Sequence, residues 1–554
     1  ASKLGNVSAK DRSSQYKNGT FHVSGDMFCS AYNIAVDHKR KATCDRHLEA
    51  STHLEKKKKM ESAAVSSSEK QGTVKALFGT KTAQQEIRKV VLFNLVEAFT
   101  SAYLPLNALD NPALHSYLEE NLKSVGVLPT SQWLHSEYFP KVFNYHIAEV
   151  KKKLADAISV SVVCDETTDV QDCYVLNVLA VPSLNTLSGN NALFLKLQIL
   201  KLSQAVLETL QKFDVPYTKV YGFVTDNAMY YEKSLKHVFL NGVHVTCSAH
   251  LLNLLGDIWR ENFDRVTDLV FAVKKAFTAT PARKAQFKQF LKEHGKSTAL
   301  PPLPVITRWN TWFHAVFYHA EHLHDYISFF LEESTAYQNV ATLSSTEKVV
   351  TDTKEIALKA PPLVQMLEKY EGDEVKAHVL YDELLDFATF LECKGESSDH
   401  QATKNTMVSC AKKIQDYMAQ NGRFHQSAAK FFEAVRVFSP ARLSTLALSE
   451  DAICSSIPAF EDNVRAKAQL RIYMRETQCH QIGLNERNII KFWQGNAECF
   501  PDLSYIVISC LSVPVHSANA ERSFSRYAVL LADNRRSIKP ENLRVYSMLQ
   551  QNKL

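Results

Sequence analysis

Five short β-rich runs lie close together in the chain between two long stretches of helical periodicity, and this arrangement limits the fold more than any other feature. Each run is rich in β-branched and apolar residues and has the length of a single strand. A helical segment near 204–213 falls among them, so this region is expected to be a mixed α/β domain. The runs are ISVSVVCD (158–165), YVLNVLAV (174–181), ALFLKLQIL (192–200), VYGFVTD (220–226) and VHVTC (243–247).

Helical periodicity flanks the β-rich region on both sides. In residues 84–154 apolar side chains recur every three or four positions, as in Ile87, Val90 and Val91, which is typical of amphipathic helices. From residue 251 to about 490 strand-like runs almost vanish. We therefore expect a helical domain before the α/β region and a large all-helical block after it.

Composition sets broad limits on the class of protein. The chain has 554 residues, 45% of them hydrophobic, and single cores stop growing near ~250 to 300 residues, so several domains are expected. No apolar run of about 18 residues and no secretory signal are found, which predicts a soluble protein without a membrane partner. The 11 cysteines form no dense framework, as is typical of a reducing compartment. The net charge of +5 gives only weak support for a nucleic-acid partner.

Two aspartates share a position relative to the predicted strands. Asp165 ends the run SVVCD and Asp226 ends the run GFVTD, and acidic side chains at strand ends can converge at one edge of a sheet. Such a pair suggests a divalent metal site, because Mg²⁺ prefers oxygen ligands and two ions ~3.5 to 4 Å apart assist phosphodiester displacement. The alternative is that either aspartate is only a turn or helix-cap residue.

Five segments occur in the order seen in one family of DNA transposases: CDETTDV, FVTDNA, CSAHLLNL, TRWNTW and SANAERSFS. Over residues 80–554 the chain resembles the hAT superfamily, and its Charlie and Buster members in particular. The resemblance implies a ribonuclease-H-like core with a catalytic triad of Asp165, Asp226 and Glu521, which would bind Mg²⁺ or Mn²⁺.

Three further acids, Glu166, Asp169 and Asp172, lie close to Asp165 in the sequence. Since they are expected beyond the strand end, solvent-facing or capping roles are predicted for them. A first-turn position on a helix would by itself be favourable for Glu521, so its role depends on the family motif.

Other segments of the resemblance assign DNA contacts. Cys247 and His250 form a Cys-x-x-His pair without a second pair at finger spacing, so a structural zinc site is not expected there. The resemblance places His250 beside the scissile phosphate and leaves Cys247 a packing role. It also implies that Arg308 and Trp309 contact DNA, with Trp309 stacking on an unpaired base for ~1 to 3 kcal/mol during hairpin formation. Simple core packing is the alternative for this pair.

The span FCSAYNIAVDHKRKATCDRHLEASTH resembles a BED-type zinc finger. Cys29, His47 and His53 match three ligands, whereas Tyr32 stands where a second cysteine is expected. Cys44 is a candidate substitute for the missing thiolate. Metal affinity in so small a module is folding energy, so the loss of a ligand would destabilise it.

Basic residues accompany this module. Lys39, Arg40, Lys41 and Arg46 are expected to contact DNA phosphates. The alternative is a degenerate finger whose basic side chains are merely solvated. The run 56–59 is most simply a solvated linker, with nuclear import as an alternative role.

The combined expectation is an α/β plus all-α protein whose ribonuclease-H-like core is interrupted by a helical insertion. The expected parts are a disordered segment (1–20), a BED-like finger (21–55), a basic and Ser-rich linker (56–80), a helical DNA-binding or dimerisation region (81–153), the first part of the core (154–262), the insertion (263–490), and the second part of the core with a dimerisation region (491–554).

The resemblance implies a nuclear cut-and-paste transposase that acts as a dimer or larger multimer. Such an enzyme binds terminal inverted repeats, cleaves the transposon ends with a hairpin on the flanking DNA, and joins the 3′ ends to target DNA. Mg²⁺ or Mn²⁺ would serve the core, and Zn²⁺ the finger. Two alternatives stay open: a domesticated DNA-binding protein without transposition, and a hydrolytic nuclease built on the same core.

Overall fold

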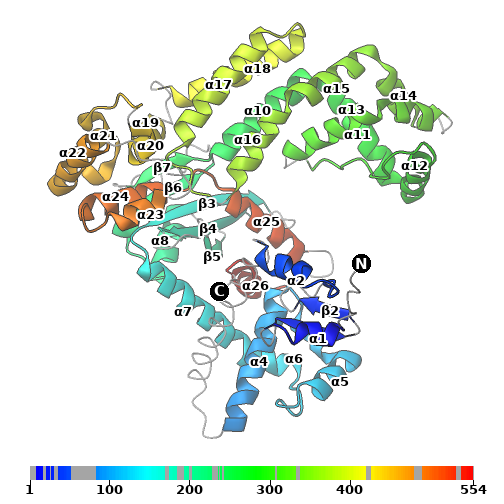
Figure 1. Cartoon of the computed structure of the whole chain (residues 1–554), viewed down its shortest axis with the longest axis vertical. Coiled ribbons are helices and arrows are strands. Elements are labelled where there is room, and N and C mark those ends of the chain that lie inside the picture. The colour runs from blue at the N-terminus through cyan, green and yellow to red at the C-terminus, as the bar shows by residue number, and fades with distance from the viewer. Residues whose placement is uncertain are drawn as a thin grey trace, which may run out of the picture. The chain divides into compact units, whose positions relative to one another are not determined.

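The computed structural model divides the chain into two compact units, Ala1–Tyr145 and His146–Leu554, which are described separately (Figure 1). None of the helices described is long and apolar enough to cross a membrane. The structure describes residues 8–16, 20–24, 26–29, 35–50, 83–168, 174–183, 192–198, 202–226, 235, 238–239, 242–305, 309–331, 337–372, 374–419, 426–443, 445–478, 489–531 and 538–552.

The first unit begins with a small module built around a β-hairpin. Its apolar core is formed by Ala9, Phe21, Met27, Cys29, Val36 and Cys44. The helix α1 (Ala9–Ser13) was not expected within the segment 1–20, and its Arg12 guanidinium is buried and donates from Nε to the His38 carbonyl at 2.9 Å. The elements are α1 (Ala9–Ser13), β1 (Phe21–Ser24), β2 (Asp26–Cys29) and α2 (Lys41–Glu49).

The helices predicted for 81–153 are present. Asn111 caps α5 by accepting from the backbone N–H of Ala113 at 3.0 Å, and Thr130 caps α6 through the N–H of Trp133 at 3.4 Å. These side chains satisfy donors that helix ends leave unpaired. The helices are α4 (Ala83–Ser101), η1 (Leu106–Asp110), α5 (Pro112–Asn121), α6 (Ser131–Glu137) and α7 (Phe139–Asp156).

The second unit is organised on a five-stranded mixed sheet with the strand order β5-β4-β3-β6-β7. The first three strands form an antiparallel meander, and β6 and β7 run parallel to β3. All five strands predicted from the sequence are present, as is the helix α8 (Leu202–Lys212) among them. The strands are β3 (Val160–Thr168), β4 (Tyr174–Pro182), β5 (Leu193–Gln198), β6 (Val220–Thr225) and β7 (Val243–Thr246).

Two C-terminal helices pack against the sheet. Helix α25 (Ala518–Leu530) contacts β3 and β4, and α26 (Pro540–Gln551) contacts β5 (Figure 1). The Asn552 side chain closes the outer strand by accepting from the Phe194 N–H at 2.7 Å and donating to the Phe194 carbonyl at 2.9 Å. Helix α26 was not anticipated from the sequence.

The described residues of 248–495 form helices and contain no strand, as predicted for residues 251 to about 490. Aromatic side chains fill one of its cores, including Phe277, Phe287, Tyr326 and Phe330. Its α-helices are α10 (Ser248–Asn262), α11 (Asp264–Ala279), α12 (Pro281–Glu293), α13 (Trp309–Leu331), α14 (Gln338–Ser345), α15 (Glu347–Lys359), α16 (Pro361–Glu371), α17 (Leu380–Glu396), α18 (Gln401–Met418), α19 (Gln426–Val435), α20 (Pro440–Leu443), α21 (Glu450–Ser456), α22 (Val464–Gln478) and α23 (Ile489–Gly495).

One boundary differs from the prediction at a position that matters for function. Strand β3 does not end at Asp165 but continues to Thr168, because its pairing with β4 extends as far as Tyr174. Glu166 is therefore a strand residue rather than a residue beyond the strand end. Asp169 and Asp172 lie outside the described residues.

A buried polar cluster lies in the helical block, on α13 and the segment before it. His319 Nδ1 is 2.9 Å from the Tyr326 hydroxyl, and His322 Nδ1 is 2.7 Å from Asp325, which also accepts from Lys296 at 2.6 Å. Burial, and then the neighbouring His322, lower the pKa of His319 to about 3. His319 is therefore held in its neutral form.

The stability of the second unit should fall as the medium becomes acidic. Because His319 has its pKa near 3 in the folded chain and about 6.5 in the unfolded chain, unfolding takes up a proton between these values. From pH 7 to pH 5 this histidine should cost about 2 kcal/mol of the free energy of unfolding. Urea unfolding of His319→Asn should lose this part of the pH dependence, whereas His324→Asn, at an exposed position of the same helix, should retain it. Equal pH dependence in both variants would contradict the assignment.

Candidate functional site

The two predicted aspartates lie close together: Asp165 is in β3, and Asp226 directly follows the neighbouring strand β6. In the parallel pair β3 and β6, Val163 is opposite Val224, and Asp165 and Asp226 each follow two residues later. Paired strands are about 4.8 Å apart, so the two carboxylates emerge at the same level of the sheet. Both side chains are half-buried.

The predicted third carboxylate comes from a distant part of the chain. Glu521 lies in the first turn of α25, the helix that packs on β3 and β4, and its side chain is exposed to solvent. The structure thus brings together Asp165, Asp226 and Glu521.

The pKa of Asp165 reflects its burial and the nearby carboxylates. Burial, followed by the charges of Glu521 and Asp226, raises the pKa of Asp165 to about 8. The backbone N–H of Glu166, which donates to Asp165 Oδ1 at 3.0 Å, acts in the opposite direction. Like charges held this close are unfavourable unless a proton or a cation neutralises them.

The carboxylates are not preassembled as a metal cage. Among the residues that the structure describes, no group of three or more His, Cys, Asp or Glu side chains is arranged to hold a metal ion. The donor set itself, three carboxylates, fits a hard divalent cation such as Mg²⁺ or Mn²⁺.

The Cys247 thiol forms hydrogen bonds with the starts of both α10 and α25. Its buried thiol caps α10 by accepting from the His250 N–H at 3.4 Å, and it also accepts from the Ser517 N–H at 3.2 Å, at the start of α25. Burial, and then the charge of Glu521, raise the pKa of Cys247 to about 11. Beyond the packing role predicted for it, this thiol joins α10 to the helix that carries Glu521.

The helical block also contacts α25. The sequence predicted this helix but not its contacts with α16. Arg522 Nη1 donates to the Glu371 carbonyl at 2.7 Å, and His516 Nε2 lies 2.9 Å from the Gly372 carbonyl. Both acceptors lie at the end of α16. The arginine beside Glu521 in the AERSFS segment was the available signal, but its partner is a backbone carbonyl that no side-chain pattern reveals.

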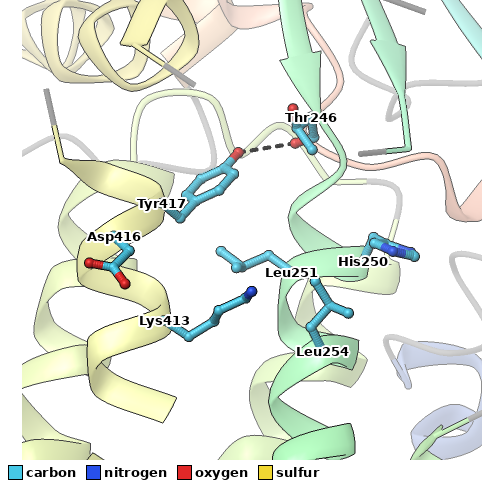
Figure 2. A pocket seen from close by; sticks show the side chains of 7 residues that line it. All are labelled: Thr246, His250, Leu251, Leu254, Lys413, Asp416 and Tyr417. Carbon is cyan, nitrogen blue, oxygen red and sulfur yellow. Dashed lines mark hydrogen bonds between the residues drawn. The ribbon is translucent and has the colours of Figure 1, made fainter. Parts of the chain in front are cut away.

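A small cavity of ≈ 130 Å³ lies between α10 and α18. Figure 2 shows Leu251 and Leu254 of α10 facing Lys413 and Tyr417 of α18, with the Tyr417 hydroxyl bonded to the Thr246 carbonyl at 3.1 Å. The remaining lining residues are His250 and Asp416. His250 is half-buried in the first turn of α10, and its contact with a scissile phosphate stays a prediction.

The structure does not describe the side chains of two residues that were predicted to contact DNA. Arg308 lies outside the described residues, and Trp309 is the first residue of α13, without a described side chain. Their DNA-binding roles stay predictions.

In the N-terminal module, the described candidate zinc ligands lie in or beside an apolar core. Cys29 and Cys44 are buried among apolar side chains, and burial raises the pKa of the Cys44 thiol, which donates to the Asp37 carbonyl at 3.6 Å. His47 is half-buried, and Tyr32 and His53 lie outside the described residues. The zinc site stays a prediction.

The predicted basic residues of this module are all exposed. Lys39, Arg40 and Lys41 surround the N-terminus of α2, where Arg40 is the capping residue, and Arg46 follows on the same helix. A helix N-terminus with exposed cations suits phosphate groups.

Comparison with known proteins identifies both ends of the chain. Residues 469–552 match the hAT family C-terminal dimerisation region. Residues 3–59 match the CGGBP1 N-terminal domain, and residues 82–141 match the CGGBP1 helical domain. The human CGG triplet repeat-binding protein 1 is 29% identical over 134 residues, which are 24% of this chain and 79% of that protein. Its mouse counterpart is 28% identical over the same shares.

These matches correct one prediction and support another. The N-terminal module corresponds to the CGGBP1 N-terminal domain rather than to a BED finger, because the Cys-x-x-Cys pair of a BED finger is incomplete at Tyr32. The C-terminal match supports the hAT relationship for the segment that contains Glu521.

Neutralising Asp165 should stabilise the metal-free protein. An acid whose pKa is raised by folding destabilises the folded chain at neutral pH, because the unfolded chain releases the proton more readily. Asp165→Asn should therefore raise the melting temperature at pH 7 in EDTA by about 2 to 4 °C, which corresponds to roughly 1 kcal/mol. Asp268→Asn, at an exposed position of α11, removes one negative charge elsewhere and should change little. A lower melting temperature for Asp165→Asn would indicate a structural role.

Proposed function

We propose that this protein is a DNA-binding protein of the hAT transposase lineage whose core cleaves and joins DNA strands with divalent metal ions. The proposal is supported by the position of Asp165 on β3 beside Asp226, which follows β6, and by the packing of the Glu521 helix on β3 and β4. Burial, followed by the charges of Glu521 and Asp226, raises the pKa of Asp165. A DNA-binding N-terminal part would bring the core to its substrate.

The strand order supports a ribonuclease-H-like core. An antiparallel meander of three strands followed by two strands parallel to the first is the arrangement expected for that fold. Asp165 lies on the central strand and Asp226 directly follows its parallel neighbour. The helical block enters between these strands and α25, as the hAT resemblance implies.

The three carboxylates would hold Mg²⁺ or Mn²⁺ at the sheet edge. When bound, the metal would lower the pKa of an attacking hydroxyl and balance the charge that develops on the phosphate. Asp165 and Asp226, fixed by the β3–β6 pairing, would set the position of the bound cation, and the exposed Glu521 would complete the ligand set. The Glu521 side chain is accessible from solvent.

Other residues would bind the DNA. His250 would contact the scissile phosphate, and Arg308 and Trp309 would hold the flanking DNA, where stacking on an unpaired base favours a hairpin. In this proposal the chain binds terminal inverted repeats and joins the 3′ ends to target DNA in the nucleus. The C-terminal region would mediate self-association, which holds two DNA ends together.

Removing one carboxylate should abolish strand cleavage. With Mn²⁺ and a labelled duplex carrying a transposon end, the wild-type chain should produce hairpin and joined products, and Asp226→Asn should lose at least about 100-fold in rate because the cation loses a ligand. Glu166→Gln, beside the site on β3, serves as the matched control and should keep most activity. A wild-type chain without cleavage or joining would reject the enzymatic proposal; cleavage without joining would indicate a hydrolytic nuclease instead.

A second candidate function is DNA binding without catalysis, as in a domesticated transposase. The observation that favours it is the match of both N-terminal regions to a protein named for binding CGG triplet repeats. We propose that the exposed cations Lys39, Arg40, Lys41 and Arg46 contact phosphates, and that Zn²⁺ held by Cys29, His47 and His53 would support the module.

DNA binding should depend on the cations around the start of α2. Arg40→Ala should weaken binding to a CGG-repeat duplex and lower the slope of log K against log salt by about 1, because one phosphate contact is lost. Lys10→Ala, on the exposed side of α1, is the control. Fluorescence anisotropy at several salt concentrations measures both. An unchanged slope for Arg40→Ala would place the DNA elsewhere, and equal affinity for a scrambled duplex would show that the module does not select CGG repeats.

A further inference from the structure

One buried amide interrupts an otherwise apolar strand. Asn177 lies in β4 among Leu176, Val178 and Leu179, and its side chain is fully buried. A polar group in such a position costs free energy unless it forms hydrogen bonds. The hydrogen bonds of its amide nitrogen therefore indicate why an asparagine occupies this position.

The position of Asn177 is tied to the carboxylate site. In the antiparallel pair β3 and β4, Asn177 is directly opposite Asp165. Opposite residues of such a pair project from the same face of the sheet. The amide thus lies on the face over which α25 packs.

The hydrogen bonds of the Asn177 side-chain amide reach α25 residues on both sides of Glu521. Asn177 Nδ2 donates to the Ala520 carbonyl at 3.3 Å and to the Ser523 hydroxyl, one residue before and two residues after Glu521. Ser523 in turn donates to the Ala520 carbonyl at 2.7 Å. Both α25 residues are buried, so these bonds are shielded from water.

We propose that Asn177 is a positioning residue that fixes the first turn of α25 against β3 and β4, so that Glu521 stands beside Asp165 and can share a divalent cation with it. This inference rests on the proposed metal site. Asn177→Leu would keep a side chain of similar size, but it would leave the rotation and height of α25 to less directional contacts. The amide nitrogen fixes both because it donates to two different atoms of one helical turn.

The test is Mn²⁺ binding by the 554-residue chain without DNA, measured by isothermal titration calorimetry. Asn177→Leu keeps the side-chain shape and removes both donors, and it should raise the Mn²⁺ dissociation constant about 10- to 100-fold, as expected for groups that orient metal ligands. Leu179→Met, a volume-conserving change on the same face of β4, is the matched control and should leave the dissociation constant unchanged. Melting temperatures of each variant show that it is folded.

The outcomes separate this inference from the proposed function. A wild-type chain that binds no Mn²⁺ overturns the metal site and this inference together. Wild-type binding with an unchanged dissociation constant in Asn177→Leu overturns the inference alone, because a merely structural amide would lower the melting temperature without changing the affinity. Ser523→Ala removes one of the two acceptors from the helix side and should weaken Mn²⁺ binding in the same direction. If Asn177→Leu does not fold, unchanged affinity in Ser523→Ala overturns the inference.

Discussion

The pairing of β3 with two neighbours is the interaction on which the rest of the second unit depends. Its parallel pairing with β6 places Asp165 level with Asp226, and its antiparallel pairing with β4 places Asn177 opposite Asp165. A shift of one residue in either register would turn these side chains to the other face of the sheet. The backbone hydrogen bonds of one strand therefore set the geometry of the candidate site.

The carboxylate site works against the stability of its own fold. Two half-buried aspartates and a glutamate repel one another, and burial adds to this cost at Asp165. Surrounding bonds offset the repulsion: the Cys247 thiol, the Arg522 guanidinium and the Asn177 amide each attach α25 or the turn before it to a different element. Strain of this kind, compensated by neighbouring contacts, is typical of functional sites.

The sequence was sufficient for the features that local patterns encode. The five strands follow from β-branched runs, and the helical block follows from apolar spacing. Strand-end placement correctly put Asp165 and Asp226 near each other, although β3 continues past Asp165 because pairing with β4 persists. Helix α25 packs on strands that are far from it in the sequence, and no local pattern encodes such a contact. The position of Glu521 could therefore be inferred only from a family motif.

Features that depend on backbone acceptors or on distant partners could not be predicted. The Cys247 thiol, the Arg522 contact and the α18 wall of the cavity all join residues far apart in the sequence. In the N-terminal module, the spacing of Cys29 and His47 resembled a BED finger, but residues 3–59 match the CGGBP1 N-terminal domain. Cysteine spacing alone does not distinguish a ligand from a small apolar side chain.

The central claim is that Asp165, Asp226 and Glu521 form one divalent metal site. The most direct measurement is the anomalous difference density of crystals grown with Mn²⁺. The account predicts a peak between the ends of β3 and β6 whose ligands include Asp165 and Asp226, with Glu521 turned toward it, and loss of that peak in Asp226→Asn. A Mn²⁺ site elsewhere, or no site at these carboxylates at saturating Mn²⁺, would contradict it.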